Sequence, residues 1–386
     1  MGVGVIGLPA AAAAAGSPGS SAALVGALVD LGAGRLTVDD IELRGWGPVA
    51  RQRPSGVERA LTVDQTHRSV VVDETWRVKW LRSTGSAAHP ALRLLAHLRA
   101  VGFSRLPQPV GVLLRGGVPL AYVDAYLPGA RDGWEWCVDR VLAVPAGGRD
   151  GGFPADLGAL VADLLVALAT PSDVVPVPVA LVDAEVVAGW RAQAEDLLDA
   201  ARRLDVAADQ PAWLPHWDPL LRDVLDRLGS VDRTVVQPVH ADLHVGQVLA
   251  WDAGLAVTDF DGHPVVTEAA DLAPAARDVA SMLASLDHVA RIADRRTDRS
   301  ASAVLRRWAR AAQASFLTAV DTGLAAAGRD DLLDVRLLGP FLVEQECRDL
   351  VYAARHLPRW RYAPWGTLAA WFGTAPDDPS RDFPWT

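Results

Sequence analysis

The strand-forming and helix-forming segments of this chain occupy separate parts of the sequence, which restricts the folds it can adopt. Between residues 61 and 128, β-rich runs are separated by turns, as in 69-SVVVDETWRVKWL-81, which is typical of a hairpin around Asp73-Glu74. Beyond Pro128-Gly129 the pattern is mostly helical and is interrupted once by strands, at about 234–262. Strands and helices in separate blocks predict an α+β fold with a small strand-rich lobe and a larger helical lobe.

Three regions follow from this pattern. Residues 1–60 are rich in Ala, Gly and Val and are expected to form an N-terminal cap. The strand-rich N-lobe is expected at residues 61–128 and the helical C-lobe at residues 129–386. Within the N-lobe, a helix is expected from about Pro90 to Val101. The C-lobe helices are expected at about 133–143, 155–169, 181–204, 217–228, 270–293, 301–327 and 337–356.

Charge and cysteine content exclude several classes of protein. The 386 residues carry a net charge of −10 and no run of Lys or Arg, which argues against nucleic-acid binding. Cys137 and Cys347 lie far apart without a CxxC motif, so neither a disulfide framework nor a cysteine zinc site is expected. No apolar run reaches the ~18 residues of a membrane span, and the N-terminus lacks a basic signal-peptide region, so we expect a cytoplasmic protein. The oligomeric state is left open.

Lysine occurs once among the 37 Lys and Arg residues, at Lys79 in 74-ETWRVKWLR-82. In a strand, Trp76, Val78 and Trp80 share one face, and Lys79 lies on the other with Arg77 and Leu81. One interpretation is a stray surface lysine in an arginine-rich chain. The other is a position that needs a compact ammonium, which a planar guanidinium does not replace.

The strands embedded in the helical region carry a group of polar residues. Two β-rich arms, 247-QVLAW-251 and 255-LAVTDF-260, are joined by a turn at residues 252–254. A tight hairpin brings its two ends together, so Asp242, Gln247 and Asp259 are expected to converge.

These residue types suit phosphoryl transfer. That reaction needs a carboxylate at the acceptor hydroxyl, oxygen ligands for Mg²⁺ and a positive charge on the nucleotide phosphates. The segments H-A-D-L-H-V-G-Q and D-F-D-G match the kinase pattern H-x-D-x-x-x-x-N followed by D-F-G. A zinc site formed by His240, His244 and an aspartate is an alternative on spacing, but it gives D-F-D-G no role. His240 and His244 are otherwise expected to support the loop.

Several longer segments extend the match. HADLHVGQVL, TDFDGHP, 277-RDVASMLASLDHVA-290, 123-VDAYLPGARDGWEWC-137 and 341-FLVEQECRDLVYAARHLPRW-360 resemble the aminoglycoside-phosphotransferase-like kinases. Within that superfamily they are most similar to actinobacterial glucosamine kinases and maltokinases. The resemblance covers about residues 65–365 and implies a bilobal protein-kinase-like fold that uses ATP and Mg²⁺ on a sugar hydroxyl.

The resemblance also implies residue roles, taken motif by motif. Asp242 corresponds to the catalytic base, and Gln247 and Asp259 to the magnesium ligands. Asp278 is expected to brace the catalytic loop by hydrogen bonding. The nucleotide-binding candidates are Lys79 and Ser69 at the phosphates and Asp124, Ala125 and Tyr126 at the hinge.

The sequence departs from the kinase pattern in two respects. No acidic residue lies between Glu74 and Asp124, so the N-lobe helix lacks the glutamate that usually holds the lysine. Glu58, Asp64 and Glu74 are the carboxylates that could replace it; otherwise Lys79 is held loosely without nucleotide. No G-x-G-x-x-G loop is present, so the turn 64-DQTHRS-69 is expected to cover the phosphates.

The acceptor is predicted from the motif near the C-terminus. In 344-EQECRDLVYAAR-355, carboxylates at helical spacing would suit a sugar that carries an ammonium. D-F-D-G-H-P, in place of the D-F-E-G-E-P more usual in maltokinases, also favours glucosamine, with the 6-phosphate as product. The alternatives are a maltokinase, another aminoglycoside phosphotransferase or a nucleotide-binding pseudokinase. The acceptor-site candidates are Asp261, Asp278, Glu344, Gln345, Glu346 and Arg348.

Overall fold

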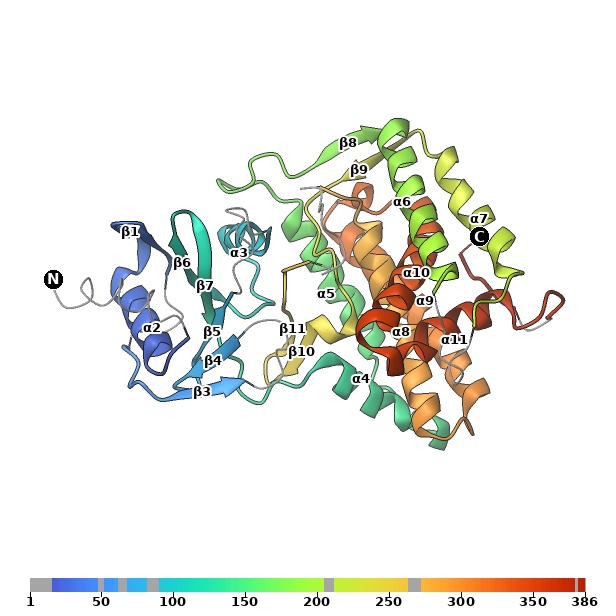
Figure 1. Ribbon diagram of the computed structural model, residues 1–386, viewed down its shortest axis with the longest axis horizontal. Helices are drawn as coiled ribbons and strands as arrows, with labels where there is room; N and C mark the ends of the chain where they lie inside the picture. Colours follow the sequence, from blue (N-terminus) through green and yellow to red (C-terminus); the bar gives the residue numbers. More distant parts are fainter. Residues whose placement is uncertain are drawn as a thin grey trace. The chain divides into compact units, whose positions relative to one another are not determined.

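The computed structural model describes residues 16–47, 52–61, 68–81, 90–204, 212–262, 272–378 and 381–385. The chain forms two compact units (Figure 1). The first comprises Met1–Ala130, Pro171–Pro176 and Trp251–Asp261, and the second comprises Arg131–Thr170, Val177–Ala250 and Gly262–Thr386. One unit is built on a sheet and the other on helices, so the predicted α+β fold is confirmed. The predicted boundaries at residues 60 and 128 stay predictions.

A seven-stranded sheet with the order β1-β2-β6-β7-β5-β4-β3 forms the first unit. Every paired neighbour in it runs antiparallel. β1 and β2 lie within the region that the sequence predicted as a cap, yet they extend the same sheet as the later strands. The strands are β1 (Ala33–Val38), β2 (Ile41–Trp46), β3 (Glu58–Leu61), β4 (Arg68–Val72), β5 (Trp76–Trp80), β6 (Pro109–Arg115) and β7 (Val118–Ala125).

Helix α2 (Ser20–Leu31) packs on one face of this sheet (Figure 1). Leu24 and Leu28 of α2 share a hydrophobic core with Trp76 and Trp80 of β5. The indole Nε1 of Trp80 donates a hydrogen bond of 3.0 Å to the hydroxyl of Ser21. The expected alternation along β5 is therefore confirmed, because this apolar face is covered and the face of Lys79 points to the other side of the sheet. Helix α3 (Pro90–Ala100) contacts β6.

The second unit is mostly helical. Helices α5 and α9 pack side by side, and α8 contacts α4, α9, α10 and α11. In the described part of the chain, none of the helices is long and apolar enough to cross a membrane. The helices are α4 (Gly133–Leu142), α5 (Phe153–Leu168), α6 (Ala184–Arg202), α7 (Trp217–Asp226), α8 (Ala276–Arg296), α9 (Ser302–Ala326), α10 (Leu338–His356) and α11 (Tyr362–Phe372).

Two elements of this unit were not predicted. Residues 181–183 were expected at the start of a helix but belong to strand β8 (Ala180–Asp183), which pairs with β9 (Arg233–Val236). The side chain of Asp183 accepts hydrogen bonds from the backbone of Glu185 and Val186, so this N-cap fixes the helix start at Ala184. Helix α11 lies in a tryptophan-rich segment for which no helix was predicted.

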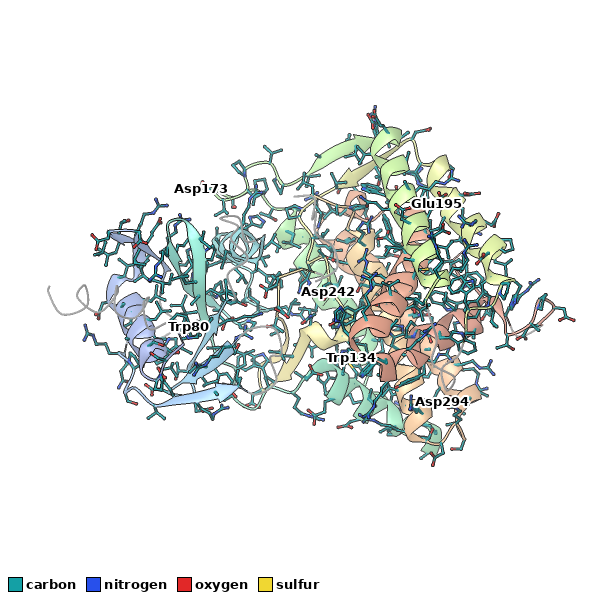
Figure 2. The ribbon with its side chains drawn as sticks, viewed as in Figure 1. Trp80, Trp134, Asp173, Glu195, Asp242 and Asp294 are labelled. Atoms are coloured by element: carbon teal, nitrogen blue, oxygen red, sulfur yellow. The ribbon has the colours of Figure 1, made fainter. Side chains whose placement is uncertain are left out.

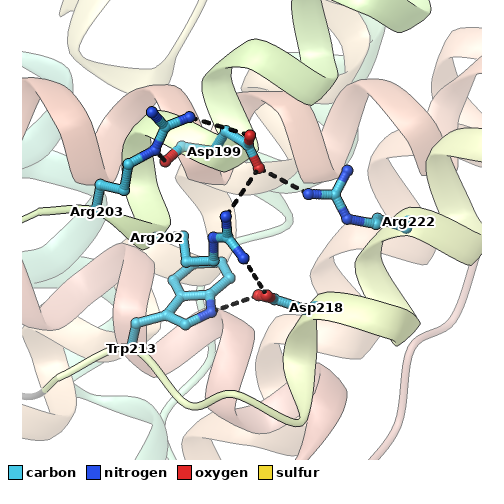
Figure 3. A network of polar contacts seen from close by, with 6 residues as sticks. All are labelled: Asp199, Arg202, Arg203, Trp213, Asp218 and Arg222. Carbon is cyan, nitrogen blue, oxygen red and sulfur yellow. Dashed lines mark hydrogen bonds and ion pairs between the residues drawn. The ribbon is translucent and has the colours of Figure 1, made fainter.

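Polar contacts connect α6 to α7 and the segment before it (Figure 3). Asp199 of α6 accepts hydrogen bonds from Arg203 (3.0 Å) and from Arg222 of α7 (2.7 Å). Asp218 accepts from Arg202 (3.2 Å) and from the indole of Trp213 (2.7 Å). These side chains are partly exposed, so the network orients α7 on α6 more than it adds to the free energy of unfolding.

The predicted hairpin within the helical region is confirmed. Strands β10 (Val248–Trp251) and β11 (Gly254–Val257) form a two-stranded sheet with a turn at residues 252–253. The division between the two units runs through this hairpin, with Trp251–Asp261 in the first unit and the preceding residues in the second.

Candidate active site

The lone lysine is buried in the sheet unit. Lys79 is 3% exposed, and its Nζ donates hydrogen bonds to Asp259 Oδ1 (2.7 Å) and Asp261 Oδ2 (2.6 Å). Both aspartates follow β11 and belong to the same unit as β5. A stray surface lysine is therefore excluded, because this ammonium is held by two carboxylates in a buried position.

The β4–β5 hairpin places this lysine. Its turn residues Asp73 and Glu74 have φ values of 50° and 49°, which is the left-handed pair that a tight hairpin turn requires. In the resulting register, Lys79 lies opposite Ser69 of β4 on one side and opposite Tyr122 of β7 on the other. Ser69 is also buried, so both predicted phosphate-side residues lie next to each other on the sheet.

Electrostatics keep the ammonium charged. Burial alone would lower the pKa of Lys79, but the neighbouring Tyr122 and the carboxylates of Asp259 and Asp261 raise it above its ordinary value. Lys79 Nζ also lies 5.9 Å from the centre of the Tyr122 ring. The site therefore carries a permanent point charge of the kind that a phosphate group binds.

Two of the carboxylates proposed from the sequence as partners of Lys79 bind elsewhere. Glu58 accepts hydrogen bonds from the backbone N–H groups of Gly19 (2.9 Å) and Ala22 (2.8 Å) at the start of α2. Glu74 forms an ion pair with Arg59 (2.8 Å). The third, Asp64, lies outside the described residues, as does most of the turn 64–69 that was expected to cover the phosphates. The carboxylates that contact Lys79 are Asp259 and Asp261.

The predicted hinge lies at the end of β7. Asp124 is buried, and its carboxylate accepts a hydrogen bond from Arg77 Nε (2.9 Å) on β5. The backbone N–H groups of Ala125 and Tyr126 donate to the carbonyl oxygens of Gln108 (2.9 Å) and Thr75 (2.8 Å). A nucleotide base would therefore contact carbonyl oxygens of this segment or replace one of these hydrogen bonds.

Residues 240–247 of the helical unit form the loop before β10. Asp278 at the start of α8 is 1% exposed and accepts hydrogen bonds from the backbone N–H groups of His240 (2.7 Å) and Ala241 (2.9 Å). This is the bracing expected from the sequence. The brace holds Ala241 at φ 68°, an unfavourable value for alanine, directly before Asp242.

Aromatic side chains support the same loop. His244 Nδ1 accepts a hydrogen bond from the Gly246 N–H (3.0 Å), and His244 Nε2 lies 3.8 Å from Asp242 Oδ2. The imidazole stacks on the indole of Trp134, with the ring centres 5.6 Å apart. Trp134 in turn contacts Trp360 edge-on at 5.3 Å. Asp242 and Trp134 can be located in Figure 2.

A zinc site at this loop is not supported. Among the described residues, the group of His, Cys, Asp and Glu side chains close enough to share a metal ion is His288, Glu346 and Asp349. His240 and His244 do not belong to it. Their contacts with the Asp278 brace and with Trp134 agree with the supporting role that the sequence suggested.

Glu344 of α10 is balanced by arginine. Its carboxylate forms ion pairs with Arg277 of α8 and with Arg348 one helical turn further along α10. Burial would raise the pKa of Glu344, but the two guanidinium groups lower it below its ordinary value. The sequence suggested that Glu344 would suit an ammonium; the structure instead gives its charge two cationic partners.

A surplus of acid lies on another face of α10. Glu346 is fully buried and is hydrogen-bonded to His288 Nε2 (2.9 Å), and Gln345 Nε2 donates to Asp349 Oδ1 (3.0 Å). Burial and the nearby Asp349 and Asp287 raise the pKa of Glu346 well above its ordinary value. Burial raises the pKa of Asp349 as well, and the charge of Asp242 adds to this rise, so Asp349 and the catalytic loop share one electrostatic environment.

The structure thus brings the predicted residues together in two groups. Lys79, Asp259 and Asp261 meet in the sheet unit, whereas Asp242, Gln247 and Asp278 belong to the helical unit. The convergence of Asp259 with Asp242 and Gln247 stays a prediction, because these residues belong to different units.

Trp134 and His288 were not among the candidates that the sequence provided. Asp349 lies one helical turn after the candidate Gln345, which donates a hydrogen bond to it. No local pattern identifies His288, because its partner Glu346 lies on another helix, 58 residues further along the sequence.

The sheet unit with its buried lysine–aspartate group and the helical unit with its braced H-x-D loop define a phosphotransferase of the two-lobed kinase class. Comparison with known proteins narrows this class, and the chain belongs to the glucosamine kinase family. It is 42% identical over 320 residues to a glucosamine kinase of Streptacidiphilus jiangxiensis, which covers 80% of this chain and 72% of the relative. A glucosamine kinase of Mycolicibacterium smegmatis is 35% identical over 326 residues, 81% of this chain and 79% of the relative.

A solved structure agrees with this assignment. A glucosamine kinase in complex with glucosamine, ADP and inorganic phosphate superimposes with a TM-score of 0.75 at 37% identity, over 92% of this chain and 83% of that one. A second crystal form of glucosamine kinase gives a TM-score of 0.77. No protein-family model matches the chain.

Proposed function

We propose that this protein is a glucosamine kinase that transfers the γ-phosphoryl group of ATP to the 6-hydroxyl of D-glucosamine. The observation that carries the proposal is the Asp242 loop, whose backbone is fixed by two hydrogen bonds to the buried Asp278. The family relationship and the relative's complex with glucosamine and ADP support it. Because the reaction uses ATP, we place it in the cytoplasm.

Asp242 is the base of the proposed reaction. Its carboxylate takes the proton of the 6-hydroxyl, and the oxygen forms a bond to the γ-phosphorus while the bond from that phosphorus to the leaving ADP oxygen breaks. The Asp278 brace fixes the backbone just before Asp242, so the base needs little reorganisation as the reaction proceeds. Lys79 supplies positive charge to the phosphates from the sheet unit.

Magnesium fits the donor types at this site. Asp259 offers a carboxylate that is 42% exposed, and Gln247 offers an amide oxygen; both are the hard oxygen ligands that Mg²⁺ prefers. Each is a residue that would hold the ion, and the ion would supply positive charge to the transferring phosphoryl group. Lys79, already held by Asp259, is the group that must keep its position when Asp259 turns to a metal ion.

The amine of the acceptor is assigned to the acidic face of α10. Burial and the nearby Asp349 and Asp287 raise the pKa of Glu346, and burial raises the pKa of Asp349, so each of these buried acids would gain from a cation beside it. An ammonium bound there compensates the cost of burying these carboxylates, whereas a neutral hydroxyl does not. The indoles of Trp134 and Trp360 offer apolar faces for a sugar ring beside the loop.

The proposal is tested by ADP release from Mg-ATP with glucosamine, N-acetylglucosamine, glucose, maltose and kanamycin as separate acceptors. We expect turnover on glucosamine far above that on glucose, and no turnover above background for Asp242→Asn. Asp252→Asn, an exposed aspartate in the β10–β11 turn, serves as the matched control and should keep the parent's activity. Turnover on maltose alone would assign the protein to the maltokinases, and turnover on kanamycin alone to the aminoglycoside phosphotransferases.

A pseudokinase is the remaining alternative. It predicts nucleotide binding without ADP release on any acceptor, and no effect of Asp242→Asn. The brace of Asp278 on the backbone before Asp242 and the buried Lys79 with its two carboxylate partners support the enzyme over the pseudokinase.

A further inference from the structure

The described part of the N-lobe helix contains no acidic side chain that could hold the phosphate-binding lysine. Helix α3 has the sequence PALRLLAHLRA, in which every ionisable side chain is basic. Kinases commonly fix this lysine by an ion pair with a glutamate of that helix. Glu58 and Glu74 are engaged at the α2 terminus and with Arg59. The lysine is nevertheless buried and doubly hydrogen-bonded.

We propose that Asp261 is the positioning residue that holds Lys79, in place of the acidic residue that α3 lacks. This inference deepens the proposed function and rests on it, because Lys79 serves a nucleotide only in a kinase. Asp261 lies two residues after Asp259, so one short segment after β11 supplies both a candidate metal ligand and the partner of the lysine.

Exposure distinguishes the two aspartates. The side chain of Asp259 is 42% exposed, whereas that of Asp261 is 19% exposed. Asp259 is therefore the residue that would hold a metal ion from solvent, whereas the more buried Asp261 is the residue that would keep the lysine in place. The shorter contact is also that of Asp261, at 2.6 Å against 2.7 Å, and this difference by itself decides nothing.

The sheet limits where the ammonium can go. Lys79 lies between Ser69 of β4 and Tyr122 of β7 in the strand register, and the Tyr122 ring centre is 5.9 Å from its Nζ. The carboxylates after β11 are thus the anionic groups that the structure places on the ammonium. A charge-assisted hydrogen bond in such a setting is stronger and more directional than one at the surface.

Chemical labelling tests the contact between Asp261 and Lys79 independently of phosphoryl transfer. Because the chain has one lysine, acylation by acetic anhydride followed by mass spectrometry of the Lys79 peptide reports this side chain alone. We expect Asp261→Asn to raise its labelling rate at least about tenfold, which corresponds to ~1.4 kcal/mol. Asp261→Glu, which keeps the charge, and Asp252→Asn, in the turn of the same hairpin, should label at the parent's rate. Equal labelling rates in the parent and in Asp261→Asn would overturn the proposal. So would a labelling rate of Asp261→Glu as high as that of Asp261→Asn.

Kinetics separate positioning from metal binding. At a Mg²⁺ concentration that saturates the parent, we expect Asp261→Asn to raise KM for ATP about tenfold or more, with a smaller fall in kcat. If a higher Mg²⁺ concentration restores the parent's KM in this variant, Asp261 is a metal ligand and the proposal fails. If the parent does not phosphorylate glucosamine, the proposed function fails, while the labelling experiment still decides whether Asp261 holds Lys79.

Discussion

The carboxylate of Asp278 at the start of α8 accepts a hydrogen bond of 2.7 Å from the backbone N–H of His240. A second one, from Ala241, completes a two-point brace on the residues before Asp242. Buried carboxylates are costly unless they are well hydrogen-bonded, and burial here raises the pKa of Asp278. The chain thus accepts a buried acid in order to fix one backbone turn, which indicates that the turn matters more than local stability.

Asp278→Asn tests this relationship. An amide keeps one acceptor but turns an NH₂ group toward the second N–H, so one hydrogen bond is lost. We expect kcat to fall about tenfold to a hundredfold and the free energy of unfolding to fall by about 1–3 kcal/mol. Urea unfolding and steady-state kinetics measure the two effects, with the exposed Asp223→Asn of α7 as control. A variant that loses stability but keeps its kcat would show that the brace serves folding alone.

Lys79→Arg tests why the chain keeps one lysine. A guanidinium is larger and planar, and the position between Ser69 and Tyr122 is buried. We expect kcat/KM for ATP to fall about a hundredfold or more, the size of effect seen when one electrostatic donor is removed from an active site. Arg115→Lys at the exposed end of β6 is the reverse exchange and should change nothing. Full activity of Lys79→Arg would show that any cation suffices there.

Glu346→Gln should stabilise the protein in a pH-dependent way. Burial raises the pKa of Glu346 in the folded state well above that of the unfolded chain. The stabilising contribution of such a group is complete below the unfolded pKa and is lost as pH rises through the folded pKa. The variant should therefore gain about 1–2 kcal/mol over the parent at pH 8 and little near pH 4.5. Thermal or urea unfolding at the two pH values measures this gain.

The same variant separates stability from recognition. If Glu346 contributes to binding of the ammonium group of glucosamine, Glu346→Gln raises KM for glucosamine and leaves the slower reaction with glucose unchanged. The His288 contact provides a check, because burial lowers the pKa of His288 and keeps its imidazole neutral. A gain in stability that does not change with pH would contradict a raised pKa of Glu346 in the folded state.

Elements whose structure depends on neighbouring residues in the sequence could be predicted from it. The β4–β5 hairpin follows from alternation and from a two-residue turn, and its register then places Lys79 on the face away from α2. Glu344 and Arg348 lie one helical turn apart in α10, and the structure joins them in an ion pair. Strand β8 has four residues, and its partner β9 lies about 50 residues further along the chain, so periodicity alone could not distinguish β8 from a helix start.

Contacts between distant segments were beyond sequence reasoning. Asp261 is 182 residues from Lys79, and its side chain was considered for the acceptor site but not for the lysine. Glu344 was interpreted as a surplus charge because Arg277, on another helix, does not belong to its sequence pattern. In both cases the residue type was noticed and the partner was missed, since partners are set by packing of whole elements.

Glu344→Gln tests the ion pairs of that residue. Removal of its charge leaves the guanidinium groups of Arg277 and Arg348 facing a neutral amide in a buried position. We expect the free energy of unfolding to fall by about 3–5 kcal/mol, as for other buried pairs from which one partner is removed. The ratio of kcat/KM for glucosamine to that for glucose should stay at the parent's value, because we propose that other acids of α10 bind the ammonium.

A double variant tests whether the loss of stability in Glu344→Gln comes from its ion pair with Arg348. Arg348→Met removes one stranded cation, so Glu344→Gln/Arg348→Met should recover part of the stability lost in Glu344→Gln, and the coupling follows from a double-mutant cycle. Urea unfolding of the parent, the two single variants and the double variant gives this coupling. If Glu344→Gln instead keeps its stability and loses its preference for glucosamine over glucose, Glu344 reads the ammonium directly, and the arginines serve only to orient its carboxylate.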